Sequence, residues 1–140
     1  MRLTADTNVL VRAFVEDDQG QAAIAKALLA QASLIAIPVP VLCEFAWVLG
    51  RSYGIATPDI AAAIGSLLDT ETVVTDVPAV EAGVAMLRNG GDFADGAVAV
   101  QGEALGGRTL VTFDKGAQLL WEKAGRDALD PKALLAALEK

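Results

Sequence analysis

Hydrophobic positions along the chain follow two alternating patterns: short runs of aliphatic residues, and longer stretches in which apolar residues recur at helical spacing. The short runs predict strands at residues 2–5, 34–37, 72–75 and 108–112, with a weakly marked fifth strand near 127–129. The longer stretches predict helices at about 7–15, 19–32, 39–52, 58–69, 78–89, 94–106 and 115–123.

This alternation of strands and helices predicts an α/β protein. Strands linked by helical crossovers pair in parallel, so we expect a central parallel sheet of about four or five strands with helices on both faces. At 140 residues the chain has the length of one domain, and we expect a single domain over 1–140. The closing "DPKALLAALEK" predicts a short amphipathic helix with Leu134, Leu135 and Leu138 on one stripe. We expect that stripe to pack on the domain's own surface, with a dimer contact as the alternative.

Composition excludes several classes of chemistry. The chain has no His and one Cys, so imidazole bases, Ser-His-Asp relays, His-ligated zinc and multi-thiolate metal sites are excluded within it. Cys43 lies in an apolar run, which favours a buried thiol in a reducing cytoplasm. Asp6 and Arg12 interrupt the N-terminal apolar segment, and no apolar run is long enough to cross a bilayer, so we expect no signal peptide and no membrane association. The net charge of −7 counts against broad nucleic-acid binding, which depends on Lys and Arg.

Acidic residues fall at positions where a parallel sheet would bring them together. Asp6 follows the first predicted strand and Asp114 follows the fourth, and ligands of open parallel sheets bind beyond the carboxyl ends of the strands. Glu44 shares a helix face with Val41 and Val48, so we expect it within or beside an apolar face, where a carboxylate needs an Arg or a cation as partner.

Two further acids lie in "GGDFADGAVAV". Asp95 shares a helix face with Val98 and Ala99, so it should point inward from the first turn, and Asp92 precedes it by three residues. Helix capping is the alternative for Asp6 and Asp114 and the favoured one for Asp92, whereas Asp95 could instead compensate the helix dipole. Glu44 caps nothing; its alternative is a salt bridge to a core Arg.

Several acids converging in one pocket favour a bound cation. Two carboxylates about 4 Å apart repel by about 4 kcal/mol at an effective dielectric constant near 20, so such groups share a proton or recruit a metal. Oxygen ligands favour Mg²⁺ or Mn²⁺ over zinc, and these ions on an α/β domain favour phosphoryl chemistry.

The same motifs resemble a known family. "ADTNVLVR", the Glu in "VPVLCEFAWVL", "GDFADGAVA" and "LVTFD" are similar, in this order and spacing, to the motifs of PIN-domain ribonucleases, and the chain most resembles the VapC toxins of bacterial toxin–antitoxin pairs. The resemblance covers nearly the whole chain. It implies that Asp6, Glu44, Asp95 and Asp114 bind Mg²⁺ or Mn²⁺ and that Asp92 is an additional acid.

The resemblance also implies roles for neighbouring hydroxyl and amide groups, and partners. Thr7, Asn8 and Thr112 would orient the acids or water. The fold implied is a five-stranded parallel sheet between helices, the substrate is RNA, and the partners are a second copy of the chain and a VapB-like antitoxin. Such antitoxins often place an Arg or an apolar helix in the acidic groove.

These features predict hydrolysis of an RNA phosphodiester by a metal-activated water, with the acids as metal ligands. Arg12 and Lys115 are weak candidates for RNA contacts. Two alternatives stay open: another Mg²⁺-dependent phosphohydrolase, which the missing Asp-x-Asp motif disfavours, and a catalytically silent binding module whose acids cap helices and receive a basic partner.

Overall fold

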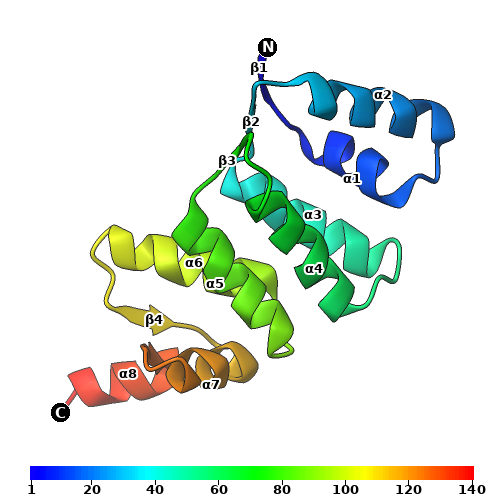
Figure 1. Ribbon diagram of the computed structural model, residues 1–140. Coiled ribbons are helices and arrows are strands. Elements are labelled where there is room, and N and C mark those ends of the chain that lie inside the picture. Colours follow the sequence, from blue (N-terminus) through cyan, green and yellow to red (C-terminus); the bar gives the residue numbers. More distant parts are fainter.

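The computed structural model describes all residues, 1–140, and contains eight helices and five strands (Figure 1). Every strand predicted from the hydrophobic pattern is present, including the weakly marked fifth. The strands are β1 (Arg2–Thr4), β2 (Leu34–Ala36), β3 (Val73–Val74), β4 (Thr109–Val111) and β5 (Asp127–Leu129).

The helices begin and end within two residues of the predicted bounds, and Pro lies at the first or second position of α3, α4, α5 and α8, where its missing N–H leaves no intrahelical bond unmade. The helices are α1 (Thr7–Val15), α2 (Gln19–Gln31), α3 (Val39–Arg51), α4 (Thr57–Leu68), α5 (Val77–Arg88), α6 (Phe93–Ala104), α7 (Lys115–Lys123) and α8 (Pro131–Leu138).

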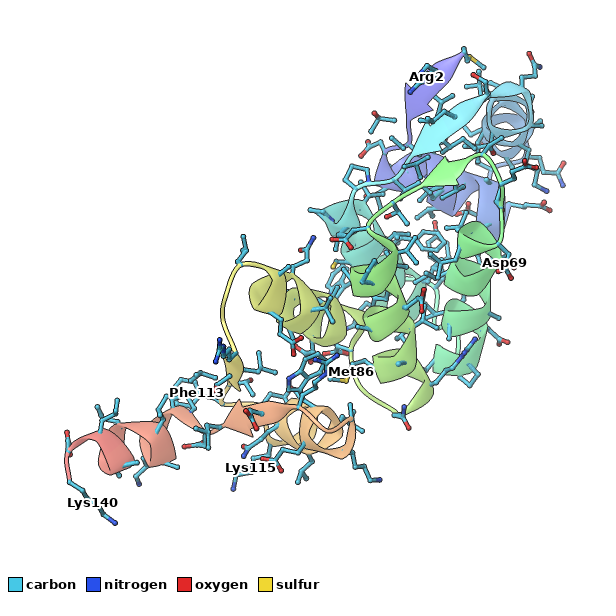
Figure 2. The ribbon with its side chains drawn as sticks, turned by 60° about the vertical axis from the view of Figure 1, so that its left-hand side comes forward. Arg2, Asp69, Met86, Phe113, Lys115 and Lys140 are labelled. Atoms are coloured by element: carbon cyan, nitrogen blue, oxygen red, sulfur yellow. The ribbon has the colours of Figure 1, made fainter.

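All strand pairs are parallel, which confirms the α/β class, but the strands form two sheets. β1, β2 and β3 make a three-stranded sheet in the order β1-β2-β3, and β4 pairs only with β5. The expectation of one central sheet is therefore not met in this arrangement: no ladder joins β1 to β4. In both views the unit formed by β4, α7, β5 and α8 lies at the opposite end of the molecule from β1 (Figures 1 and 2).

Two hydrophobic cores correspond to these two parts. The larger core lies under the three-stranded sheet and between α1, α3, α4, α5 and α6, with Phe45, Leu49, Ile64 and Phe93 among its fully buried side chains. The smaller core consists of Met86, Ala99, Trp121 and Ala128, and it fixes the C-terminal unit to the outer side of α5 and α6.

Helices α5 and α6 pack more closely than any other pair. A Cβ atom added at Gly96 would lie 2.3 Å from the carbonyl oxygen of Ala82, and one added at Gly83 would lie 2.4 Å from the ring of Phe93. Only glycine permits this separation of the two backbones. The start of α6, which carries Asp92 and Asp95, is thereby held rigidly against α5.

Helix α8 differs from the sequence expectation. None of its residues is buried, and Leu135 and Leu138 are 58% and 74% exposed. The prediction that its apolar stripe packs on the domain's own surface is therefore wrong for this arrangement, because the C-terminal unit points away from the main body (Figure 2).

Candidate functional site

Two of the predicted site acids belong to the three-stranded part of the molecule. Asp6 lies two residues beyond β1, and Glu44 lies in α3, the helix that follows the neighbouring strand β2. Because β1 and β2 are parallel, both acids follow the same edge of this sheet. Both side chains are exposed, and neither forms a salt bridge.

The exposure of Glu44 corrects one expectation. The neighbouring residues Leu42 and Phe45 are buried, but Glu44 itself is exposed. An apolar stripe at helical spacing fixes which residues face the core, and Glu44 falls beside that stripe. It therefore needs neither an Arg nor a cation to offset burial, and the alternative of a salt bridge to a core Arg is excluded as well.

The other three acids form a second group around the start of α6. Asp95, in the first turn, is half-buried, as its helix face predicts, and burial raises the pKa of its carboxyl group; the nearby charges of Asp92 and Asp114 raise this pKa further. Neither Asp6 nor Glu44 contributes to this shift. Asp92 and Asp114 therefore lie close enough to Asp95 for their charges to act on it.

Helix capping explains the position of Asp114 but not those of Asp6 and Asp92. A side-chain oxygen of Asp114 accepts a hydrogen bond of 3.0 Å from the backbone N–H of Ala117, in the first turn of α7. Asp6 and Asp92 also occupy N-cap positions, of α1 and α6, yet their side chains make no capping hydrogen bond. Their carboxylates are left available for another ligand.

The hydroxyl and amide residues predicted beside the acids have distinct environments. The Oγ1 atom of Thr112 accepts a hydrogen bond of 3.0 Å from the backbone N–H of Asp114, which fixes the turn that carries this acid. Thr7 is the only polar residue among the buried ones, and Asn8 is exposed. Thr112 is thus the one residue of the three whose hydrogen bond orients a candidate ligand.

The two candidate RNA contacts also differ. Arg12 donates a hydrogen bond of 2.8 Å to Asp17 and lies 3.5 Å from the hydroxyl of Tyr53. The hydrogen bond with Asp17 and its charge raise the pKa of Arg12, while the hydrogen bond from Tyr53, and then that from Arg12, lower the pKa of Asp17. Arg12 is therefore engaged on the protein's own surface, whereas Lys115, beside Asp114, is exposed and forms no salt bridge.

The single chain does not gather the acids into a metal site. No group of three or more carboxylates or other ligating side chains lies close enough to hold one ion. All donors present are oxygens suited to Mg²⁺ or Mn²⁺. Asp6 and Glu44 follow strands of the three-stranded sheet, Asp92 and Asp95 lie at the start of α6, and Asp114 follows β4. The chemistry of these donors suits Mg²⁺ or Mn²⁺, whereas this arrangement of the chain does not bring three of them together around one ion.

A cleft of about 370 Å³ lies between the end of α3 and the turn that leads into α6. Trp47, which is 60% exposed, and Arg51 line it from α3, and Asp92 lines it from the turn. Sequence reasoning did not single out this cleft, because neither the exposure of Trp47 nor its proximity to the Gly90–Gly91 turn can be read from the sequence.

A comparison with known protein families identifies the family of the chain. The profile of the PIN domain matches residues 4–120, which is most of the chain and includes all five candidate acids. The chain belongs to the PIN domain family, and PIN domains are typically Mg²⁺-dependent nucleases, so the match supports activity of the nuclease kind. No curated protein matches the chain. None of the eight helices combines the length and the apolar character needed to span a membrane.

Proposed function

We propose that this protein is a Mg²⁺- or Mn²⁺-dependent endoribonuclease and the toxin of a toxin–antitoxin pair, acting in the cytoplasm. The observation that carries the proposal is the family match over residues 4–120, a range that contains Asp6, Glu44, Asp95 and Asp114. The raised pKa of Asp95 supports it, because a divalent cation would offset both the burial of this carboxylate and its repulsion from Asp92 and Asp114.

The roles we propose follow from the chemistry of the side chains. The four carboxylates would be the metal ligands, and the metal would supply the charge that activates water and neutralises the phosphate. Thr112, through its hydrogen bond to the backbone of Asp114, would be a positioning residue. Lys115 is the better of the two candidates for contact with RNA, since Arg12 is already paired with Asp17.

The proposed protein partner is a basic antitoxin. The net charge of −7 favours association with a positively charged partner. The cleft beside Trp47 offers an apolar surface next to the carboxylate of Asp92, which suits an apolar helix that carries an Arg.

Purified protein incubated with RNA and Mg²⁺ or Mn²⁺ tests the nuclease function. We expect cleavage that chelation abolishes and that Asp6→Asn or Asp95→Asn abolishes without loss of thermal stability. Lys132→Gln, an exposed change in the first turn of α8, is the matched control and should cleave as the unmodified protein does. RNA that stays intact with either ion, in a protein that binds neither, would favour the catalytically silent binding module.

A further inference from the structure

We propose that the cleft between α3 and the start of α6 receives one unpaired base of single-stranded RNA, stacked on the indole of Trp47, while Arg51 contacts a phosphate of the same strand. The proposal rests on the proposed function, because it names how the substrate of that function is held. Trp47 and Arg51 would be positioning residues, which bind the strand and take no part in the chemical step. The cleft would hold RNA in the free protein, and the antitoxin proposed above would displace it.

Trp47 presents an aromatic surface to solvent that the protein itself leaves uncovered. It is 60% exposed, whereas the other tryptophan, Trp121, is 5% exposed. No aromatic ring and no side-chain cation stacks on Trp47. Tryptophan normally buries most of its large apolar surface, and unpaired bases of any identity stack on exposed aromatic rings. Trp47 is therefore a suitable stacking platform for a base.

The cleft beside Trp47 has the size and the apolar floor that a base requires. Its volume of about 370 Å³ lies within the range of small-ligand sites, about 300–1,000 Å³. Buried apolar side chains form the floor: Ala46, Ile60, Leu87 and Phe93. Such a floor accepts a flat ring that has two apolar faces, whereas it offers no ligand to a free ion. The polar groups of the cleft lie at its rim, where they can reach the edge of a base or its phosphate.

Gly50 keeps the cleft open next to Trp47. It lies within α3 and lines the cleft. A Cβ atom added there would lie 3.6 Å from Cδ1 of Ile60, an ordinary van der Waals distance, so the packing of the protein does not require glycine. Glycine also weakens a helix relative to alanine. The missing side chain at this position is therefore better explained by space for a ligand than by the fold.

Arg51 supplies the positive charge that an RNA strand needs in an acidic protein. It follows Trp47 by four residues, which places both on one face of α3, and it lines the same cleft. Arg51 is exposed and forms no salt bridge, whereas the guanidinium groups of Arg12 and Arg126 are paired with carboxylates. In a chain with a net charge of −7, a free guanidinium beside an exposed aromatic ring is the local combination that suits a phosphate and its base.

The cleft adjoins candidate acids on both of its sides. Glu44 precedes Trp47 by three residues on α3, which places their Cβ atoms about 5–6 Å apart. Asp92 lines the cleft from the turn before α6, and Asp95 follows in the first turn of that helix. A base in the cleft would thus belong to a nucleotide next to the phosphate held at these acids. Because stacking needs an unpaired base, the favoured substrates are single strands and loops, and base-paired RNA is disfavoured.

Tryptophan fluorescence tests the stacking contact without cleavage. Trp121 is the only other tryptophan and is buried, so quenching by acrylamide reports mainly on Trp47. In an Asp95→Asn background with Mg²⁺, a single-stranded oligouridylate should quench Trp47 and shield it from acrylamide, whereas an RNA duplex should do neither. An oligouridylate that leaves this fluorescence unchanged would assign the cleft to the protein partner alone and overturn the proposal, and equal quenching by the duplex would overturn it as well.

The affinity of a labelled oligouridylate, measured by fluorescence anisotropy, tests the size of the contribution. Trp47→Ala should raise the Kd about 5- to 140-fold, the equivalent of about 1–3 kcal/mol for one stacked base, and Trp47→Phe should raise it less. Leu138→Ala, which shortens another exposed apolar side chain, is the control and should leave the Kd unchanged. An unchanged Kd in Trp47→Ala would overturn the proposal.

Two further variants separate binding in the cleft from effects on folding. Arg51→Gln should lower the slope of log Kd against log salt concentration by about 0.7, the value for one phosphate contact on a single strand. Arg88→Gln removes the same charge from an exposed position outside the cleft and should leave that slope unchanged, so equal slopes in the two variants would refute the phosphate contact. Gly50→Ala should keep or raise the Tm and yet weaken binding, because its methyl group occupies the cleft.

Cleavage kinetics distinguish failure of the base site from failure of the proposed function. Trp47→Ala should raise the KM for RNA with kcat nearly unchanged, as expected for a contact made equally in the ground state and the transition state. If the unmodified protein binds the oligouridylate through Trp47 but cleaves no RNA, the proposed function fails and the base site stands. If it cleaves RNA with a KM that Trp47→Ala does not change, the base site fails and the proposed function stands.

Discussion

Replacing Gly96 by alanine tests whether the close approach of α5 and α6 holds the start of α6 in place. The new Cβ would lie 2.3 Å from the carbonyl oxygen of Ala82 and 2.9 Å from Cγ of Met86. The first contact involves backbone, which cannot rotate away, so the two helices must separate. Asp95, the preceding residue, would move with α6.

Gly102 provides the matched control within the same helix. An added Cβ there meets nothing within 4 Å, so Gly102→Ala should stabilise the protein by roughly 0.5–1 kcal/mol through the higher helix propensity of alanine. At Gly96 the same propensity gain is outweighed by overpacking, which costs about 1–3 kcal/mol. Because the propensity gain is common to both sites, we expect Gly96→Ala to be less stable than Gly102→Ala by about 1–3 kcal/mol.

Thermal unfolding followed by circular dichroism measures this difference in stability between the two variants. Urea denaturation provides a second measurement. For a chain of this length, 1 kcal/mol corresponds to a shift of about 3–4 °C in Tm, so the two variants should differ by about 3–12 °C. If both variants proved equally stable, the close packing of α5 on α6 would be refuted, and with it the account of how Asp95 is positioned.

Two further predictions concern the acids around the start of α6. Asp95→Asn should raise the free energy of unfolding at neutral pH, because the pKa of Asp95 is raised in the folded protein by burial and by the charges of Asp92 and Asp114, so ionisation disfavours the native state. The gain should shrink as the pH falls through the raised pKa and vanish below the ordinary pKa of aspartate, which urea titrations at a series of pH values would detect; a gain that persists in acid would contradict it. Asp114→Ala should lower stability by about 1 kcal/mol through loss of the cap to Ala117, whereas Asp114→Asn should retain most of it. Thermal melts of the two variants would be compared, and equal losses would show that the cap contributes nothing.

The sequence predicted individual elements well because the signals for them are local. Periodicity of apolar residues defined α3 from its buried Leu42, Phe45 and Leu49, and the short run at 127–129 proved to be a strand. The predicted helix bounds agree with the observed ones because Pro and Asp near helix starts act within one turn. None of these signals depends on how distant parts of the chain are arranged.

Local sequence signals do not determine which strands pair with one another. The pattern of "RTLVT" indicates a strand but does not state whether its partner is β1 or β5, so the division into two sheets was missed. The same limit applies to Glu44: helical spacing placed it beside buried residues, but its exposure depends on what packs over α3. The candidate site was therefore predictable as a set of residue types and not as an assembled pocket.

The N-cap aspartates show where helix capping explains an acidic residue and where it does not. Six helices have Asp at the N-cap, and in four of them the side chain accepts a backbone N–H: Asp18, Asp76, Asp114 and Asp130. Asp6 and Asp92 occupy the same kind of position without that bond, so capping does not explain why these two acids are aspartates. An N-cap carboxylate turned away from the helix forgoes about 1 kcal/mol of stabilisation. Such a loss is typical of residues kept for binding or catalysis, and it falls on Asp6, which follows β1, and on Asp92, at the start of α6.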